Sequence, residues 1–201
     1  LMDRGAPPAV LREAAAARAA CDDLYARFHG HDGGRLQLSA IPRFALSCTP
    51  ALLRHAAAFA AAHGLLVQTH ISESLDEVAA TRAAFPASRD YLGVYEDHGL
   101  VGPRTILAHC IHFSDDEWAR MRDQDVAIAH CPDSNFFLGS GQMPLRRALD
   151  LGLRVGLGTD VGAGRTFSLR RVAAAAYDAA LVRGEPVPPE ELLWLATRGG
   201  A

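Results

Sequence analysis

Three short apolar runs of the sequence each end in a side chain that binds metals well. They are Leu65–His70, Thr105–His109 and Val155–Asp160. Such runs indicate buried parallel strands, and a (β/α)8 barrel carries its functional groups at the C-terminal ends of its strands. Because imidazole and carboxylate groups suit zinc or iron, we expect His70, His109 and Asp160 to form a metal site. A metal of this kind lowers the pKa of a bound water, so the predicted chemistry is metal-assisted hydrolysis.

A carboxylate, Glu73, follows His70 by three residues, where the predicted strand gives way to a loop. This spacing suits a proton-transfer group beside a metal ligand. The alternative interpretation is a core histidine followed by a glutamate that caps a helix. Two further histidines, His112 and His130, lie after or at the ends of predicted strands. We predict that these two line the site or have structural roles.

The turn around Asp160 is rich in glycine, reading Gly158-Thr-Asp-Val-Gly-Ala-Gly164. A turn like this could cradle a phosphate, but it lacks the G-x-x-x-x-G-K-[ST] pattern. We therefore predict that Asp160 contacts the metal and also accepts the proton of its water. A second metal-like pattern, His29-Gly-His31, follows a predicted helix and precedes Gly33 and Gly34, so we interpret it as part of a loop.

Arg43 and Phe44 follow the first complete predicted strand, so we expect them at the same face of the barrel. An arginine offers a planar fork of donors for a carbonyl or carboxylate, and a phenylalanine offers a flat surface for a planar ring. We predict that both bind substrate. The alternative is a solvated arginine and a core phenylalanine.

Helical segments rich in alanine and arginine alternate with short β-rich runs, which is the pattern of βα units around a parallel sheet. We expect strands at 35–41, 65–70, 105–109, 126–130 and 154–159, and helices at 8–28, 50–63, 74–85, 88–98, 114–123, 142–150, 166–182 and 188–196. The predicted fold class is α/β, a (β/α)8 barrel of the TIM type. At 201 residues the chain is shorter than the about 250 that such a barrel needs, so we expect an incomplete span, one domain over residues 1–201 that forms the C-terminal part of the barrel.

Composition argues against several functional classes. The net charge is −3 and no basic cluster indicates nucleic-acid binding. No apolar run approaches the roughly 18 residues that cross a bilayer. The four cysteines are far apart and form no C-x-x-C pair, which favours buried thiols in a reducing compartment. We expect a cytoplasmic protein that acts on a small molecule.

Several motifs together resemble the amidohydrolase superfamily and, within it, the guanine deaminases. They are Pro42-Arg-Phe-Ala-Leu-Ser47, Gln68-Thr-His-Ile-Ser-Glu73, Leu107-Ala-His109, Ala129-His-Cys-Pro-Asp-Ser-Asn135, Leu138-Gly-Ser-Gly141, Gly156-Leu-Gly-Thr-Asp-Val161 and Leu195-Ala-Thr-Arg-Gly-Gly-Ala201. The resemblance implies hydrolysis of guanine to xanthine and ammonia, with one zinc ion, or iron, per active site. It also implies that Glu73 shuttles protons, that Arg43 holds the purine carbonyl, and that the protein is a homodimer.

The chain departs from this family pattern at its beginning. The family's first-strand Asp-x-His-x-His pair and its flanking β-sandwich are absent from the sequence. We therefore expect this span alone to bind zinc weakly and to be an incomplete enzyme. Two alternatives stay open: a related deaminase or chlorohydrolase acting on another purine, a pterin or a triazine, and an inactive barrel remnant or interaction module. The other deaminase design is excluded because the sequence contains no P-C-x-x-C.

Overall fold

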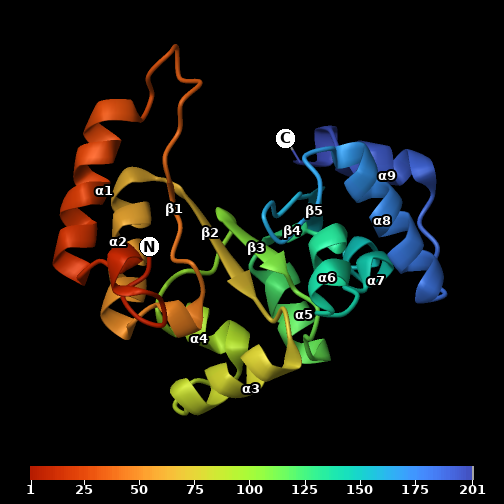
Figure 1. Cartoon of the computed structure of the whole chain (residues 1–201), viewed down its shortest axis with the longest axis horizontal. Coiled ribbons are helices and arrows are strands. Elements are labelled where there is room, and N and C mark those ends of the chain that lie inside the picture. Colours follow the sequence, from red (N-terminus) through yellow and green to blue (C-terminus); the bar gives the residue numbers. More distant parts are fainter. Residues whose placement is uncertain (201) are drawn as a thin grey trace. The chain divides into compact units, whose positions relative to one another are not determined.

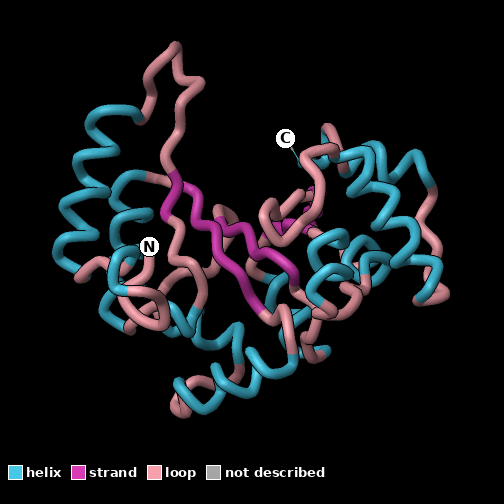
Figure 2. The backbone as a smooth tube through the Cα atoms, viewed as in Figure 1, coloured by secondary structure: helices cyan, strands magenta, loops and turns pink. Residues whose placement is uncertain are grey.

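The structure, a computed structural model, describes residues 1–200 (Figure 1). It comprises two compact units: unit 1 is Leu1–Thr69 with Thr81–Thr105, and unit 2 is His70–Ala80 with Ile106–Ala201. β1 pairs with β2, β3 with β4 and β4 with β5, in each case in parallel. The strand order follows the chain, β1-β2-β3-β4-β5. Because parallel strands need crossover connections, helices lie between them along the chain, and the predicted α/β class is confirmed (Figure 2).

The strands are β1 (Ser39–Ala40), β2 (Leu66–Ile71), β3 (Thr105–His109), β4 (Ala127–His130) and β5 (Arg154–Leu157). The helices are α1 (Ala14–Phe28), α2 (Pro50–His63), α3 (Leu75–Ala84), α4 (Tyr91–Asp97), α5 (Asp115–Asp123), α6 (Pro132–Leu138), α7 (Leu145–Asp150), α8 (Leu169–Val182) and α9 (Pro189–Leu195). Short 3-10 turns are formed by Pro8–Val10, Ala45–Ser47 and Arg198–Gly200.

The core of unit 2 is built on β3, β4 and β5. Leu107 is in register with Ile128, and Ile128 with Val155, so three apolar side chains lie in one row across the sheet. All three are at most 2% exposed. Helices α7, α8 and α9 contact β5, and α6 and α9 contact α8 (Figure 1). This packing fixes the strand ends that carry the polar residues discussed below.

Helix α2 of unit 1 shows how local sequence sets the bounds of an element. Thr49 accepts a hydrogen bond from the backbone N of Leu52, and Pro50 occupies the first helical position. Gly64 ends the helix in a left-handed conformation with φ of 61°. Helix α5 of unit 2 likewise begins with a capping box, formed by Ser114 and Glu117. Both helices therefore begin and end close to where the sequence predicts.

Two predicted elements are shorter than expected. The helix predicted at 8–28 begins only at Ala14, because Pro8–Val10 forms a single turn that ends at Leu11 in an extended conformation. The strand predicted at 35–41 pairs only over Ser39–Ala40. Leu36 instead bonds within a turn, donating to the carbonyl of His31 and accepting from Gly30. Backbone groups used in this way cannot pair with a neighbouring strand.

One helix was not predicted. Helix α6 follows directly on the strand that ends at His130, where the sequence indicates a motif but no helix. Its ends do carry a signal: Pro132 stands at the first helical position, and Gly139 follows the helix with φ of 68°. The ends of the other predicted elements lie within three residues of the observed ones.

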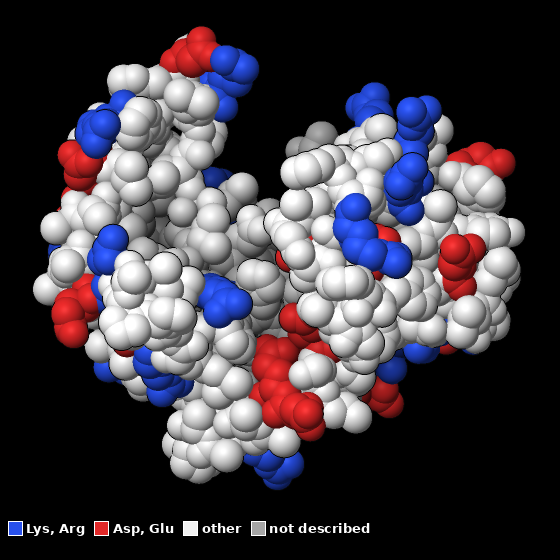
Figure 3. Space-filling view, in the orientation of Figure 1, with Lys and Arg blue, Asp and Glu red and all other residues white. Residues whose placement is uncertain are grey.

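No helix among the described residues is long and apolar enough to cross a membrane. On the face drawn in Figure 3, acidic and basic side chains form separate small groups among uncharged ones. This distribution agrees with the small net charge of the sequence.

Candidate metal and catalytic site

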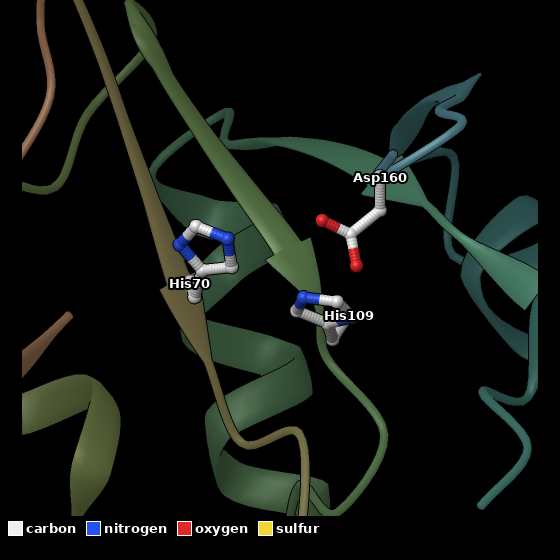
Figure 4. A group of neighbouring side chains, drawn as sticks. All are labelled: His70, His109 and Asp160. Atoms are coloured by element: carbon white, nitrogen blue, oxygen red, sulfur yellow. The ribbon is translucent and has the colours of Figure 1, made fainter. Parts of the chain in front are cut away.

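Three of the predicted site residues converge in unit 2. His70 lies near the end of β2, His109 ends β3, and Asp160 lies in the segment after β5. Their side chains point toward one another (Figure 4), and one ligand atom of each lies within 4.8 Å of the others. The rings of His70 and His109 are stacked with centroids 5.3 Å apart. The structure therefore brings together two imidazoles and a carboxylate that are distant in sequence.

The backbone at the strand ends adopts conformations that most residues avoid. His109 has φ of 73°, Asp160 has φ of 47°, and Ser72 has φ of 53°. Left-handed backbone at residues other than glycine is uncommon and clusters at functional sites. Hydrogen bonds hold the chain there, since Cys110 donates to the carbonyl of Ile71 across the strand ends. The sharp turns place the side chains of the strand ends in one cluster.

The His109 ring is buried and is held from one side only. Its Nδ1 lies 2.9 Å from the side-chain oxygen of Asn135, so Nδ1 carries the proton and donates it. Its Nε2 is buried without a hydrogen-bond partner among the described residues. The nearest carboxylate oxygen, Oε2 of Glu73, is 3.6 Å from this nitrogen, too far for a hydrogen bond. An imidazole with a buried, unpartnered Nε2 is suited to bind a metal ion.

The two candidate carboxylates are each fixed by a serine. Oδ2 of Asp160 accepts a hydrogen bond of 2.5 Å from Ser134, which leaves its other oxygen for a ligand or a proton. Oε1 of Glu73 accepts one of 3.1 Å from Ser140. Oε2 of Glu73 faces His109, whereas the sequence placed this carboxylate beside His70; its role in proton transfer stays a prediction.

The other histidines occupy different settings. Nε2 of His112 donates to the carbonyl of Ser140 over 2.8 Å, which is a structural contact. His130 is 1% exposed, and neither ring nitrogen has a hydrogen-bond partner among the described residues. Burial, with a smaller effect of His109, lowers the pKa of His130 to about 3, so this ring is neutral. Nδ1 of His29 accepts from the backbone N of Leu38 in the predicted loop of unit 1.

The cysteine beside the site is protonated. Cys131 is buried directly before α6, and burial together with the negative charges of Asp160 and Glu73 raises the pKa of its thiol to about 12. A thiol in this state is a poor nucleophile at neutral pH. Cys131 therefore packs as a small apolar side chain, as the sequence indicates for the cysteines.

The predicted substrate residues lie in unit 1. The guanidinium carbon of Arg43 is 5.2 Å from the centroid of the Phe44 ring, and the Arg43 side chain is exposed. The carbonyl of Arg43 accepts a hydrogen bond from the hydroxyl of Thr69 on β2, which fixes the backbone at this point. Arg43 and Phe44 thus lie together after β1, and their role in substrate binding stays a prediction.

Three polar residues of the site were not assigned a role from the sequence. Ser134, Asn135 and Ser140 belong to α6 and the turn after it, and each is at most 9% exposed. The sequence does hold a signal for them. Serine and asparagine follow a proline that can start a helix and precede a glycine that can end one, and this segment comes directly after a strand end.

Together, the fold and the site define a parallel α/β protein with a candidate metal site of two histidines and an aspartate at its strand ends. The chain belongs to the amidohydrolase family, whose model matches residues 2–201.

The relatives sharpen this assignment. The guanine deaminase of Escherichia coli is 36% identical over 202 residues, covering 100% of this chain and 46% of that protein. A solved E. coli guanine deaminase structure matches with a TM-score of 0.96. A guanine deaminase from C. acetobutylicum with guanine bound in the active site is 34% identical, with a TM-score of 0.95 over 99% of this chain and 49% of that one.

A third relative has a different activity. The atrazine chlorohydrolase of Arthrobacter aurescens, solved with zinc, is 27% identical, with a TM-score of 0.87 over 100% of this chain and 46% of that one. The chain spans about half the length of the proteins that it matches. These likenesses confirm the predicted fold of a partial amidohydrolase barrel.

Proposed function

We propose that the protein containing this chain hydrolyses guanine to xanthine and ammonia with one zinc ion. The observation that carries the proposal is the cluster of His70, His109 and Asp160 with the unpartnered Nε2 of His109. The likeness to guanine deaminases, one of them with guanine bound, supports this substrate over others. Zinc held by these three residues would supply hydroxide at neutral pH.

The chain's own residues divide the remaining work. Asp160 accepts the proton of the attacking water through the oxygen that Ser134 leaves open. Glu73, half-buried beside His109, delivers a proton to the substrate, which assists breakage of the bond between C2 and the amino group. A C–O bond forms at C2 and the C–N bond to the amino group breaks. One proton of the water leaves with ammonia, and the other remains on a ring nitrogen of xanthine.

Arg43 and Phe44 supply the substrate contacts in this proposal. The guanidinium donates to the purine carbonyl, and the ring of Phe44 packs against the base. Adenine lacks that carbonyl and cannot accept these hydrogen bonds, so guanine is favoured. The family resemblance further supports a cytoplasmic homodimer. Light scattering coupled to gel filtration tests whether the protein is a dimer.

The test uses the full-length protein that contains this chain. We expect about one bound zinc per chain and release of ammonia from guanine, but not from adenine or a chlorinated triazine. Glu73→Gln keeps the shape of the side chain and removes its acid, so kcat should fall by about 100-fold to 10,000-fold. The matched control is Glu190→Gln on the exposed first turn of α9.

A second variant tests the substrate contact. Arg43→Ala should lower kcat/KM for guanine at least about 10-fold, whereas Arg54→Ala, on an exposed position of α2, should not. An unchanged value for Arg43→Ala would remove that residue from the site. Turnover of the triazine in place of guanine would favour the chlorohydrolase alternative, which is the activity named for the Arthrobacter relative.

A further inference from the structure

One short segment contacts two of the candidate metal ligands. On α6, Ser134 donates to Oδ2 of Asp160 over 2.5 Å, and the neighbouring Asn135 accepts from Nδ1 of His109 over 2.9 Å. Ser134 is 0% exposed and Asn135 is 2% exposed. Polar groups buried this deeply cost free energy unless they are hydrogen-bonded, so both contacts are specific features of the fold.

The amide of Asn135 is satisfied on one side only. Its oxygen bonds His109, but its Nδ2 is buried without a hydrogen-bond partner among the described residues. An apolar side chain of similar size would avoid that cost. The cost is therefore explained by what the oxygen does, which is to hold the proton of His109 on Nδ1 and leave Nε2 free to bind metal.

The turn after α6 contacts the third candidate group. Ser140 donates to Oε1 of Glu73 over 3.1 Å, while its carbonyl accepts from Nε2 of His112 over 2.8 Å. The backbone N of Ser140 in turn bonds the carbonyl of Asn135 over 2.9 Å. The serine is therefore tied at both its backbone groups while its hydroxyl holds the carboxylate.

The helix is also fixed to the segment that carries Asp160. Asp133 on α6 accepts hydrogen bonds of 2.6 Å from both the backbone N and the guanidinium of Arg165. Asp133 is 7% exposed, so this pair is sheltered on the carboxylate side. As a result, α6 and the loop after β5 hold a fixed spacing at the site.

We infer that α6 and its C-terminal turn supply three positioning residues for the active site, namely Ser134 for Asp160, Asn135 for His109 and Ser140 for Glu73. The inference rests on the proposed function for the identity of the reaction, but not for the binding of zinc. Groups that orient metal ligands typically change metal affinity or activity by about 10-fold to 100-fold when removed.

The effect of replacing each residue should depend on which group it positions. Ser134→Ala and Asn135→Leu release candidate metal ligands, so each should raise the zinc Kd by about 10-fold to 100-fold in competition with a chromogenic chelator. Asn135→Asp keeps an oxygen for Nδ1 and should restore most of the affinity. Ser140→Ala releases only a proton-transfer group, so it should lower kcat for guanine about 10-fold while the zinc Kd stays within about twofold.

The control is Ser88→Ala, which removes a serine hydroxyl that donates to Asp97 over 2.7 Å at an exposed position. Circular dichroism of each variant verifies folding before zinc is measured. A zinc Kd within about twofold of the wild type in both folded Ser134→Ala and Asn135→Leu would overturn the inference. If the wild type binds zinc with these shifts but releases no ammonia from guanine, the proposed function fails and the positioning role stands.

Discussion

Gly158, directly after β5, lies close to Cys131, directly before α6. A Cβ added there would lie 2.9 Å from Sγ of Cys131, whereas ordinary contacts of carbon lie at about 3.5–4.0 Å. Gly158→Ala therefore forces a displacement of about 0.6–1.1 Å. The neighbours cannot yield freely, since Cys131 is 4% exposed and the backbone N of Gly158 bonds the carbonyl of His130 over 2.9 Å. Such overpacking costs about 1–3 kcal/mol.

The assay is a double-mutant cycle in urea with chelator present. Gly158→Ala should lower the free energy of unfolding by about 1–3 kcal/mol in the wild type. In the Cys131→Ala background the sulfur is gone, so the same change should be nearly neutral, giving a coupling of similar size. Because Gly158 stands two residues before Asp160, the single variant should also lower kcat, and Cys131→Ala should restore part of it. An equal loss of stability from Gly158→Ala in both backgrounds would show that the contact with Cys131 does not cause the destabilisation.

Two further predictions concern the same part of unit 2. Gly141 has φ of 125°, and an added Cβ would lie 3.0 Å from Cγ2 of Ile111, so Gly141→Ala should destabilise the protein by about 1–3 kcal/mol in urea unfolding. Hydrogen bonds from Arg165 hold the pKa of Asp133 below its usual value. This pair therefore stabilises the fold above the ordinary carboxyl pKa of about 3.9 and loses its effect as the pH falls through the lower folded pKa. The Tm of Asp133→Asn should approach that of the wild type as the pH falls from 7 to 3, and a constant Tm difference would contradict the assignment.

The helices and strands that were predicted most accurately are those whose start and end signals lie in or beside the element itself. Helix α2 has the predicted bounds of 50–63 because Thr49 and Pro50 start it and Gly64 ends it. Strand β3 likewise covers the predicted 105–109. In contrast, the strand predicted at 35–41 contracts because its first residues bond to the turn before them. Competition of this kind depends on the folded backbone and leaves no periodic pattern in the sequence.

The candidate metal ligands could be predicted from the sequence, but the residues that position them could not. His70, His109 and Asp160 each end or follow an apolar run, so their convergence follows from the geometry of parallel strands. The partners that hold them do not follow from any spacing. Asn135 lies 26 residues from His109, and Ser140 lies 67 residues from Glu73. Only the packing of α6 brings them together.

The end of β4 explains why one strand-end histidine differs from the others. His130 also follows an apolar run, so the pattern alone would allow it as a ligand. The structure leaves it outside the cluster of His70, His109 and Asp160, as a buried neutral ring with a pKa of about 3. A charged imidazole there would repel a cation at the site, whereas a neutral one does not. The chain after β4 instead forms α6, which contacts the candidate ligands carried by the neighbouring strands. In the proposed function, adjacent strand ends thus have two roles, to bind the metal and to orient the groups that bind it.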